Sequence, residues 1–222
     1  MSVLFRRAKY IFESEGLKPL FRRGFTFLIG YFFQYGTFYV YEHTIKEGNE
    51  ADFMPKIQNF TFQVVFTNQQ ANELCANGFD LRSFSIYARR RLDKGAIAFC
   101  ILIGRELAHI GWVAMTEEAK NTFEPYPYRV DFLNKEACTG GTITIPKYEK
   151  KGLMTYGYYK RFQFLRERGV VTSRNAVDTS NIVSQRVHAK FGPKIYAKAR
   201  YLKILWWKLW KETPLVLTSH HD

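Results

Sequence analysis

The chain has 222 residues, of which 46% are hydrophobic and 24% charged, a composition that predicts a buried core and excludes intrinsic disorder. Its formal net charge of +13 favours an anionic partner, which is nucleic acid, anionic lipid or a phosphorylated small molecule. The three cysteines are odd in number and lack metal-site spacing. This argues against a disulfide framework and predicts a reducing, cytoplasmic location, with no bound metal.

Residues 1–58 are expected to form a helical and aromatic extension that packs on the core. Helices are predicted over residues 3–15 and from Pro19 onward. The uncharged run 24–41 is interrupted by glycines and tyrosines and is shorter than the roughly 20 apolar residues of a membrane span. Residues 37–42 have strand composition. The alternative for this extension is peripheral contact with a membrane through its basic and aromatic residues.

The main unit is expected over residues 59–211. Its first half is predicted to contain, in order, a strand at 60–66, a helix at 69–76 capped by Thr67 or Asn68, a helix at 81–92, two strands at 96–103 and 107–115, and a loop at 117–134. Gly104 lies between the two strands, which predicts an antiparallel hairpin.

The second half is predicted to contain a strand at 137–145, a helix at 153–168, a strand at 170–177, a helix from a Thr179 or Ser180 cap to Lys190, and one or two strands over 194–206. Gly140 and Gly141 inside a strand indicate a bulge or a closely approaching ligand. Residues 206–212 are basic and amphipathic and are expected to pack on the N-terminal helices or to rest on a membrane. Residues 212–222 are expected to be a flexible tail.

Two motifs in the second half carry chemistry. A strand ends at Pro146, passes through a basic loop with Gly152 and becomes a helix, so several backbone amides converge at the positive end of a helix dipole. Such a place can hold a phosphate. Further on, Asn181, Ser184 and His188 are spaced i, i+3 and i+7, which puts them on one helix face.

In order and spacing, these motifs resemble the acyl-CoA-binding half of the GNAT N-acetyltransferase superfamily, over roughly residues 60–206. The family pattern is a strand ending at a proline, a basic loop with glycines, a helix, a second strand, and then an asparagine, a small residue and a tyrosine. The resemblance implies an α/β fold with a GNAT-like mixed, mostly antiparallel central sheet flanked by helices. It also implies transfer of an acyl group, first of all acetyl, from acyl-CoA to a primary amine by direct attack.

By the resemblance, acetyl-CoA or another acyl-CoA contacts the strand, the loop and the two helices through Thr142, Thr144, Tyr148, Glu149, Lys150, Lys151, Gly152, Leu153, Met154, Asn181 and Ser184. His188 stands in the place of the family's tyrosine and would reprotonate the departing thiolate. The alternative is a histidine on the surface or at a cap. Glu149 and Met154 depart from the family pattern, which motivates a second hypothesis, a catalytically silent fold that binds acyl-CoA or a partner.

A general base for the acceptor amine is less clearly marked. Glu117 is favoured because it follows a strand that lines the acceptor side in the family, whereas the other carboxylates considered are Glu118, Glu124, Asp131 and Glu136. Some family members need no dedicated base. The acceptor is expected to be a small-molecule or peptide amine. Nucleic acid is a distant third hypothesis because basic and aromatic residues lack an RNA-binding signature, and a homodimer is left open.

Overall fold

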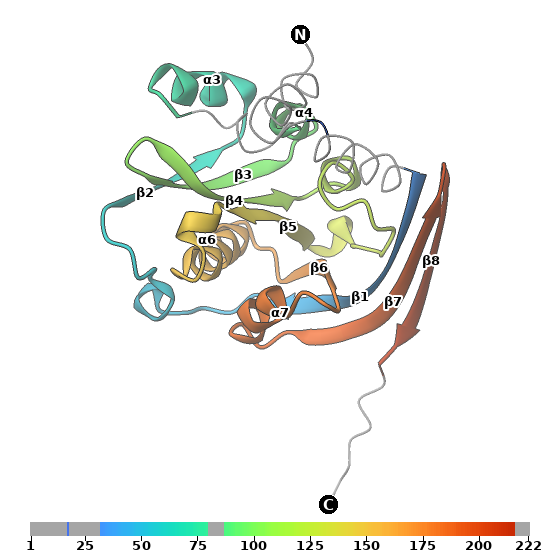
Figure 1. Ribbon diagram of the computed structural model, residues 1–222. Helices are drawn as coiled ribbons and strands as arrows, with labels where there is room; N and C mark the ends of the chain where they lie inside the picture. The colour runs from blue at the N-terminus through green and yellow to red at the C-terminus, as the bar shows by residue number, and fades with distance from the viewer. Residues whose placement is uncertain (1–16, 18–31, 80–86, 216–222) are drawn as a thin grey trace, which may run out of the picture.

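The computed structural model describes residues 17, 32–79 and 87–215. The helices predicted over 3–15 and from Pro19, and the start of the helix predicted over 81–92, lie outside these residues. Figure 1 shows one sheet with helices on both faces. The strand order is β2-β3-β4-β5-β6-β1-β7-β8, and every neighbouring pair is antiparallel except β5 and β6. The predicted mixed, mostly antiparallel α/β fold is confirmed.

The strands are β1 (Phe33–Thr44), β2 (Phe60–Val65), β3 (Ile97–Ile103), β4 (Glu106–Ala114), β5 (Glu136–Thr144), β6 (Thr172–Asp178), β7 (Lys194–Ile204) and β8 (Trp207–Pro214). Strand β1 lies inside the sheet, between β6 and β7, and pairs with both. Residues 33–44, which the sequence placed in the extension, therefore belong to the same sheet as the main unit. The boundary near residue 58 otherwise stays a prediction.

The helices are α3 (Asn68–Ala76), α4 (Ala88–Asp93), α5 (Glu117–Lys120), α6 (Leu153–Glu167) and α7 (Ile182–Ala189), with 3-10 turns η1 (Glu50–Phe53), η3 (Phe132–Asn134) and η4 (Pro146–Tyr148). Thr67 caps α3 through its side chain, as predicted. Within the described residues, no helix combines the length and the apolar character that crossing a bilayer requires.

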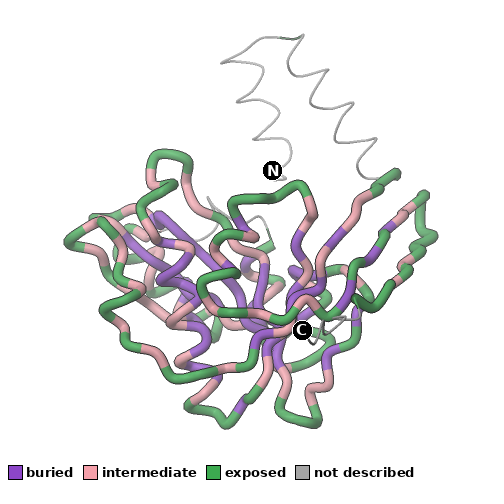
Figure 2. The backbone as a smooth tube through the Cα atoms, turned by 90° about the horizontal axis from the view of Figure 1, so that it is seen from below, coloured by how far each residue is buried: buried purple, intermediate pink, exposed green. Residues whose placement is uncertain are grey.

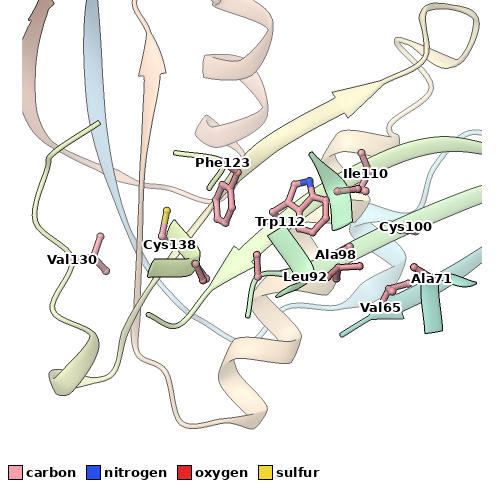
Figure 3. Packing of buried hydrophobic residues seen from close by; sticks show 14 of the residues in the cluster. Val65, Ala71, Leu92, Ala98, Cys100, Ile110, Trp112, Phe123, Val130 and Cys138 are labelled. Atoms are coloured by element: carbon pink, nitrogen blue, oxygen red, sulfur yellow. The ribbon is translucent and has the colours of Figure 1, made fainter. Parts of the chain in front are cut away.

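Buried side chains form a core on each face of the sheet. One core contains Trp112, Phe123 and Cys138 and is covered by α4 and the segment around α5 (Figure 3). The other contains Phe99 and Val113 and is covered by α6. Figure 2 shows that buried residues gather in the middle of the molecule. The two cores together enclose β3 and β4, which is why the sequences of these strands are mostly apolar.

Three local predictions were wrong. The segment predicted as a loop over 117–134 contains α5, which Thr116 caps. The cap of α7 is Asn181, whose side chain accepts a hydrogen bond from the Ser184 amide, because Ser180 instead binds Asp178. Strand β8 continues to Pro214, so residues 212–214 are part of the sheet rather than of a flexible tail.

Candidate functional site

The parallel strands β5 and β6 pair over only three positions. Glu136 lies opposite Thr172, Ala137 opposite Ser173, and Cys138 opposite Arg174. Beyond Cys138 and Arg174, β5 pairs only with β4 and β6 only with β1. The two strands therefore diverge. We call the V-shaped gap between them the splay, and backbone groups that face it have no partner in the strand ladder.

A bulge in β5 accompanies the splay. Ile110 and Trp112 of β4 lie opposite Ile143 and Gly140, so β5 carries one extra residue over this stretch. Gly141 takes a positive φ of 56°, which favours glycine. The bulge predicted from the glycine pair is therefore confirmed. Such a bulge bends the strand and interrupts its regular pairing.

The carboxylate of Glu124 lies in the splay. A Cβ atom on Gly140 would come within 2.5 Å of Glu124 Oε2, so the carboxylate rests directly on the β5 backbone. On the opposite side, the backbone amide of Ala176 in β6 stabilises the charged form. Gly140 and Ala176 each lie two residues beyond the last β5–β6 pair. A single carboxylate thus bridges the diverging strands.

Burial sets the protonation of this carboxylate. Glu124 is only 5% exposed, and its Oε1 atom is buried without a hydrogen-bond partner. Desolvation raises the pKa of Glu124 to about 8, although the Lys120 charge and the Ala176 amide oppose the shift. A carboxylate whose pKa lies near the working pH is suited to accept a proton from a substrate.

Glu117, the base favoured from the sequence, lies elsewhere. It is in the first turn of α5, its side chain is 58% exposed, and Oε1 lies 3.3 Å from Lys120 Nζ. The Lys120 side chain is fully buried, donates to the Tyr126 carbonyl at 2.9 Å and lies over the Tyr128 ring. Glu117 therefore balances the charge of a buried lysine. Its role as base stays a prediction.

On the α6 side of the sheet, a guanidinium lies next to the splay. Arg161 is fully buried and donates from Nη1 to Thr142 Oγ1 at 3.2 Å and from Nε to the Gly157 carbonyl at 3.0 Å. Its guanidinium carbon is 3.7 Å from the centre of the Tyr158 ring. Among the described residues, no carboxylate forms an ion pair with it. Its Nη2 atom is buried without a hydrogen-bond partner.

A chain of hydrogen bonds connects His43 in β1, His188 in α7 and Asn175 in β6. His43 Nε2 lies 3.0 Å from His188 Nδ1, and Asn175 Nδ2 lies 3.0 Å from His188 Nε2. Because the amide nitrogen can only donate, His188 accepts at Nε2 and donates from Nδ1 to His43. His43 then carries its own proton on Nδ1, the buried atom that lacks a partner.

These histidines are neutral near pH 7. Desolvation, followed by the Arg161 charge, lowers the pKa of His43 to about 4, and the same two causes lower the pKa of His109 in β4 to about 3. Burial, His43 and Arg161 together hold the pKa of His188 well below its usual value. The predicted acid role of His188 stays a prediction. Its protonation state does not favour that role, because few His188 side chains carry a transferable extra proton at neutral pH.

The predicted phosphate-binding loop joins β5 to α6. Gly152 occupies the N-cap of α6 with φ of 86° and has no side chain to cap the helix. No capping side chain therefore accepts a hydrogen bond from the backbone N–H groups of the first turn. Glu149, Lys150 and Lys151 are all exposed, and the Glu149 carboxylate is therefore not directed inward by packing. This loop can accept an anionic group at the amide end of the helix.

The structure brings most of the predicted binding residues to one side of the splay. Thr142 contacts Arg161, and Thr144 Oγ1 lies 2.8 Å from His109 Nδ1. Tyr148 donates to Glu106, outside the loop. Leu153 is buried, Met154 packs against the core under α6, and Ser184 is buried beside the Asn181 cap. Their contacts with coenzyme A stay predictions.

Sequence reasoning did not find Arg161, Asn175, His43 or His109, and it named Glu124 only as one of several acids. Each of these side chains comes from a different segment of the chain, so no local spacing connects them. The one usable signal for Arg161 was a charged residue on the apolar face of a predicted helix, between Tyr158 and Phe162. Within the described residues, no group of three or more His, Cys, Asp or Glu side chains is arranged to hold a metal ion.

The sequence matches no protein-family model and no curated protein. Solved structures do match. A GNAT-family protein from Novosphingobium aromaticivorans has a TM-score of 0.51 at 14% identity, with 78% of this chain and 65% of that chain covered. An acetyltransferase of the GNAT family from Colwellia psychrerythraea has a TM-score of 0.50 at 15% identity, with coverages of 78% and 57%.

A tandem GNAT protein from the clavulanic acid biosynthesis pathway has a TM-score of 0.52 at 15% identity, and the match covers 87% of this chain and 59% of that chain. The chain thus spans between 57% and 65% of the length of these three proteins. At such identities the likeness shows the fold alone. The chain has the fold of the GNAT N-acetyltransferases.

Proposed function

We propose that the protein is an acyl-CoA-dependent N-acyltransferase that transfers an acetyl group to a primary amine. One observation carries this proposal, namely a buried carboxylate, Glu124, inside the splay of β5 and β6. At this gap, strand amides without strand partners lie beside a proton acceptor. An acyl group and an amine bound here would contact both. The GNAT fold supports the same class of reaction.

Glu124 is the base in this proposal, in place of Glu117. It takes one proton from the acceptor ammonium, and the free amine attacks the thioester carbonyl. The new C–N bond forms as the C–S bond breaks, the second amine proton goes to the leaving sulfur, and Glu124 returns its proton to solvent. The reaction therefore needs no covalent acyl-enzyme. Base catalysis by a positioned side chain contributes about 10²–10⁴ in rate.

The β5 backbone is the proposed electrophilic element. Beyond Cys138, amides on the β6 side of β5 have no ladder partner. A fixed amide that donates to the thioester carbonyl stabilises the negative charge that its oxygen gains during attack. Arg161 anchors this stretch from the other face through Thr142. Arg161 contacts the β5 strand through Thr142, so we assign it a positioning role.

The residues present fit an acyl-CoA. The backbone N–H groups in the first turn of α6 have no side-chain cap, and Lys150 and Lys151 in the same loop are exposed cations. These groups would hold the pyrophosphate, while Thr142 and Thr144 line the strand that the pantetheine follows. Glu149 is exposed and can turn to solvent, which removes the main objection to phosphate binding at this loop.

Thermal shift with acetyl-CoA and free CoA tests binding, and thiol release with a panel of primary amines tests transfer. We expect both cofactor forms to raise the melting temperature. Glu124→Gln should abolish most thiol release but keep the CoA shift. Glu118→Gln is a matched control because Glu118 is 66% exposed and pairs with Lys94; it should leave both unchanged.

Two results would decide against the enzyme. A shift with CoA but no thiol release with any amine would favour the catalytically silent acyl-CoA-binding fold. No shift with either CoA form, together with a salt-sensitive shift with a short oligonucleotide, would favour nucleic-acid binding. Equal activity of Glu124→Gln and the parent protein would exclude Glu124 as the base, but it would not contradict the proposed acyl transfer.

A further inference from the structure

The outer end of the β1, β7 and β8 strands presents an apolar surface to solvent. Phe33, Ile204 and Trp207 are register partners across the three strands, and Tyr35, Leu202 and Leu209 form the next row. Residues spaced by two along a strand share a face. These six side chains therefore lie on one face of the sheet, which we call the apolar sheet face.

This face is open in the described part of the molecule. Trp207 is 73% exposed, Tyr35 is 65% and Leu209 is 63%. Figure 1 shows β7 and β8 at the edge of the sheet, beyond the region that α6 and α7 cover. A hollow of about 390 Å³ lies here, lined by Leu202, Ile204, Leu205, Trp207, Lys208 and Leu209. Contiguous exposed apolar surface of this kind marks an interaction site.

The turn between β7 and β8 has an unusual composition. Leu205 and Trp206 connect the paired residues Ile204 and Trp207. Two-residue hairpin turns normally use glycine, asparagine or aspartate, because a positive φ is needed. Leu205 adopts a φ of 56° despite its side chain, and Trp206 is 76% exposed. Large apolar residues at a strained, exposed turn indicate a contact that uses them.

The same face becomes basic farther along the strands. The row after Tyr35 and Leu209 contains Arg200 opposite Lys211, and the next contains Lys198 opposite Thr213. All four are exposed. No acidic residue occurs in these rows on β1, β7 or β8. The face thus combines an apolar end with a basic band. A second copy of the chain offers no acidic side chain from this face to match that band.

We propose that the apolar sheet face docks on an anionic lipid bilayer. Trp and Tyr prefer the membrane interface, where their rings meet both apolar chains and polar headgroups. Basic residues near the surface add attraction to anionic headgroups. Phe32 joins the tip through its carbonyl, which accepts from the Leu205 amide at 2.6 Å. The sequence just before it, residues 24–31, carries no charge.

Co-sedimentation of the full chain with vesicles tests the proposal, with phosphatidylcholine alone and with a mixture containing phosphatidylserine. We expect binding to the anionic vesicles that weakens with salt. Trp206→Ser/Trp207→Ser should lower the partition coefficient at least tenfold. Arg200→Gln and Lys211→Gln should each lower it about fivefold. Leu133→Ser is the control because Leu133 is 95% exposed on η3; it should change nothing.

Three results would overturn the proposal. The first is no binding to anionic vesicles, and the second is equal binding by the parent and the double tryptophan variant. The third is that Trp206 and Trp207 are protected from an aqueous quencher in the absence of lipid. Their fluorescence is obtained as the difference between the parent and Trp206→Phe/Trp207→Phe. Protection with a dimer by light scattering would assign the face to a second copy, and protection in a monomer to another segment of this chain. None of these readouts depends on acyl transfer.

Discussion

The splay and the apolar sheet face distribute polarity in opposite ways. At the splay, Glu124, Arg161 and three histidines are buried among aromatic side chains. At the β7–β8 tip, Trp206 and Trp207 are exposed and the charges lie beside them. Neither arrangement is expected to stabilise the fold. Burying an unpaired charge costs free energy, and exposed tryptophans forgo burial. The two regions are therefore where we look for function.

The sharpest test of the splay separates activity from stability. Glu124→Gln should reduce turnover about 10²–10⁴-fold by removing the base. The same change should stabilise the fold at pH 8. Folding holds a proton on Glu124 up to a pKa of about 8, whereas the unfolded carboxyl releases it near 4.5, so native stability falls as pH rises between these values.

Chemical denaturation at pH 5 and pH 8 measures this effect. Glu124→Gln should gain roughly 3–5 kcal/mol over the parent at pH 8 and little at pH 5. In the parent, kcat/KM should rise with pH through an inflection near 8. A less active variant that is also less stable at pH 8 would mean that the carboxylate is a structural hydrogen-bond acceptor instead of a base.

The histidines should give the opposite pH dependence. Their folded pKa values lie below the unfolded value of 6.5, with His43 at about 4 and His109 at about 3. Above pH 6.5 they contribute no pH dependence. As pH falls below 6.5, these histidines are protonated in the unfolded chain but stay neutral in the folded chain, so stability falls. Each should cost about 2 kcal/mol of stability by pH 5.

This acid loss is best measured in the Glu124→Gln background, where the carboxyl no longer titrates. His109→Gln should flatten the slope between pH 6.5 and 5 by about a third, because His43 and His188 still titrate below the unfolded value. Arg161→Met should also flatten it, because the Arg161 charge adds to burial in lowering the pKa of all three histidines. Unchanged slopes in both variants would place the acid sensitivity outside this cluster.

Local signals predicted the elements of the fold well, and the site poorly. The Thr67 cap, the Gly104 hairpin and the Gly140–Gly141 bulge each depend on residues close in sequence, so their chemistry is visible there. The insertion of β1 between β6 and β7 depends on pairing between residues at least 128 positions apart, such as Phe38 with Asp178. Nothing in either segment specifies its partner.

The sequence could not distinguish the surroundings of Glu117 from those of Glu124 for a related reason. Both acids follow β4 in a segment without strong periodicity, and only tertiary packing decides that Glu124 enters the sheet while Glu117 pairs with Lys120. The spacing predicted that His188 lies on a helix, and the structure places it buried in α7. Its neighbour His43, 145 residues away, could not be foreseen, and that neighbour helps to keep it neutral.

Gly140→Ala should have a smaller effect than the pH changes. The added Cβ would approach Glu124 Oε2 to 2.5 Å, so the carboxylate must shift within a closed core. We expect a cost of about 1–3 kcal/mol in the free energy of unfolding. The double variant with Glu124→Ala provides the control. If Gly140 exists to make room for the carboxylate, its replacement should cost much less in that background, whereas strict additivity would show that the two residues are independent.

The smallest effect is expected at Trp207, and Trp210 on the same strand is its matched comparison. Trp210 points to the other face, stacks on Tyr126 with ring centroids 5.7 Å apart and donates to Glu212. Trp210→Ala should cost about 3 kcal/mol. Trp207→Ala should change the free energy of unfolding by less than about 0.5 kcal/mol. A large loss at Trp207 would mean that it packs on the chain itself, and the contrast between a splay built for chemistry and a face built for docking would fail at that residue.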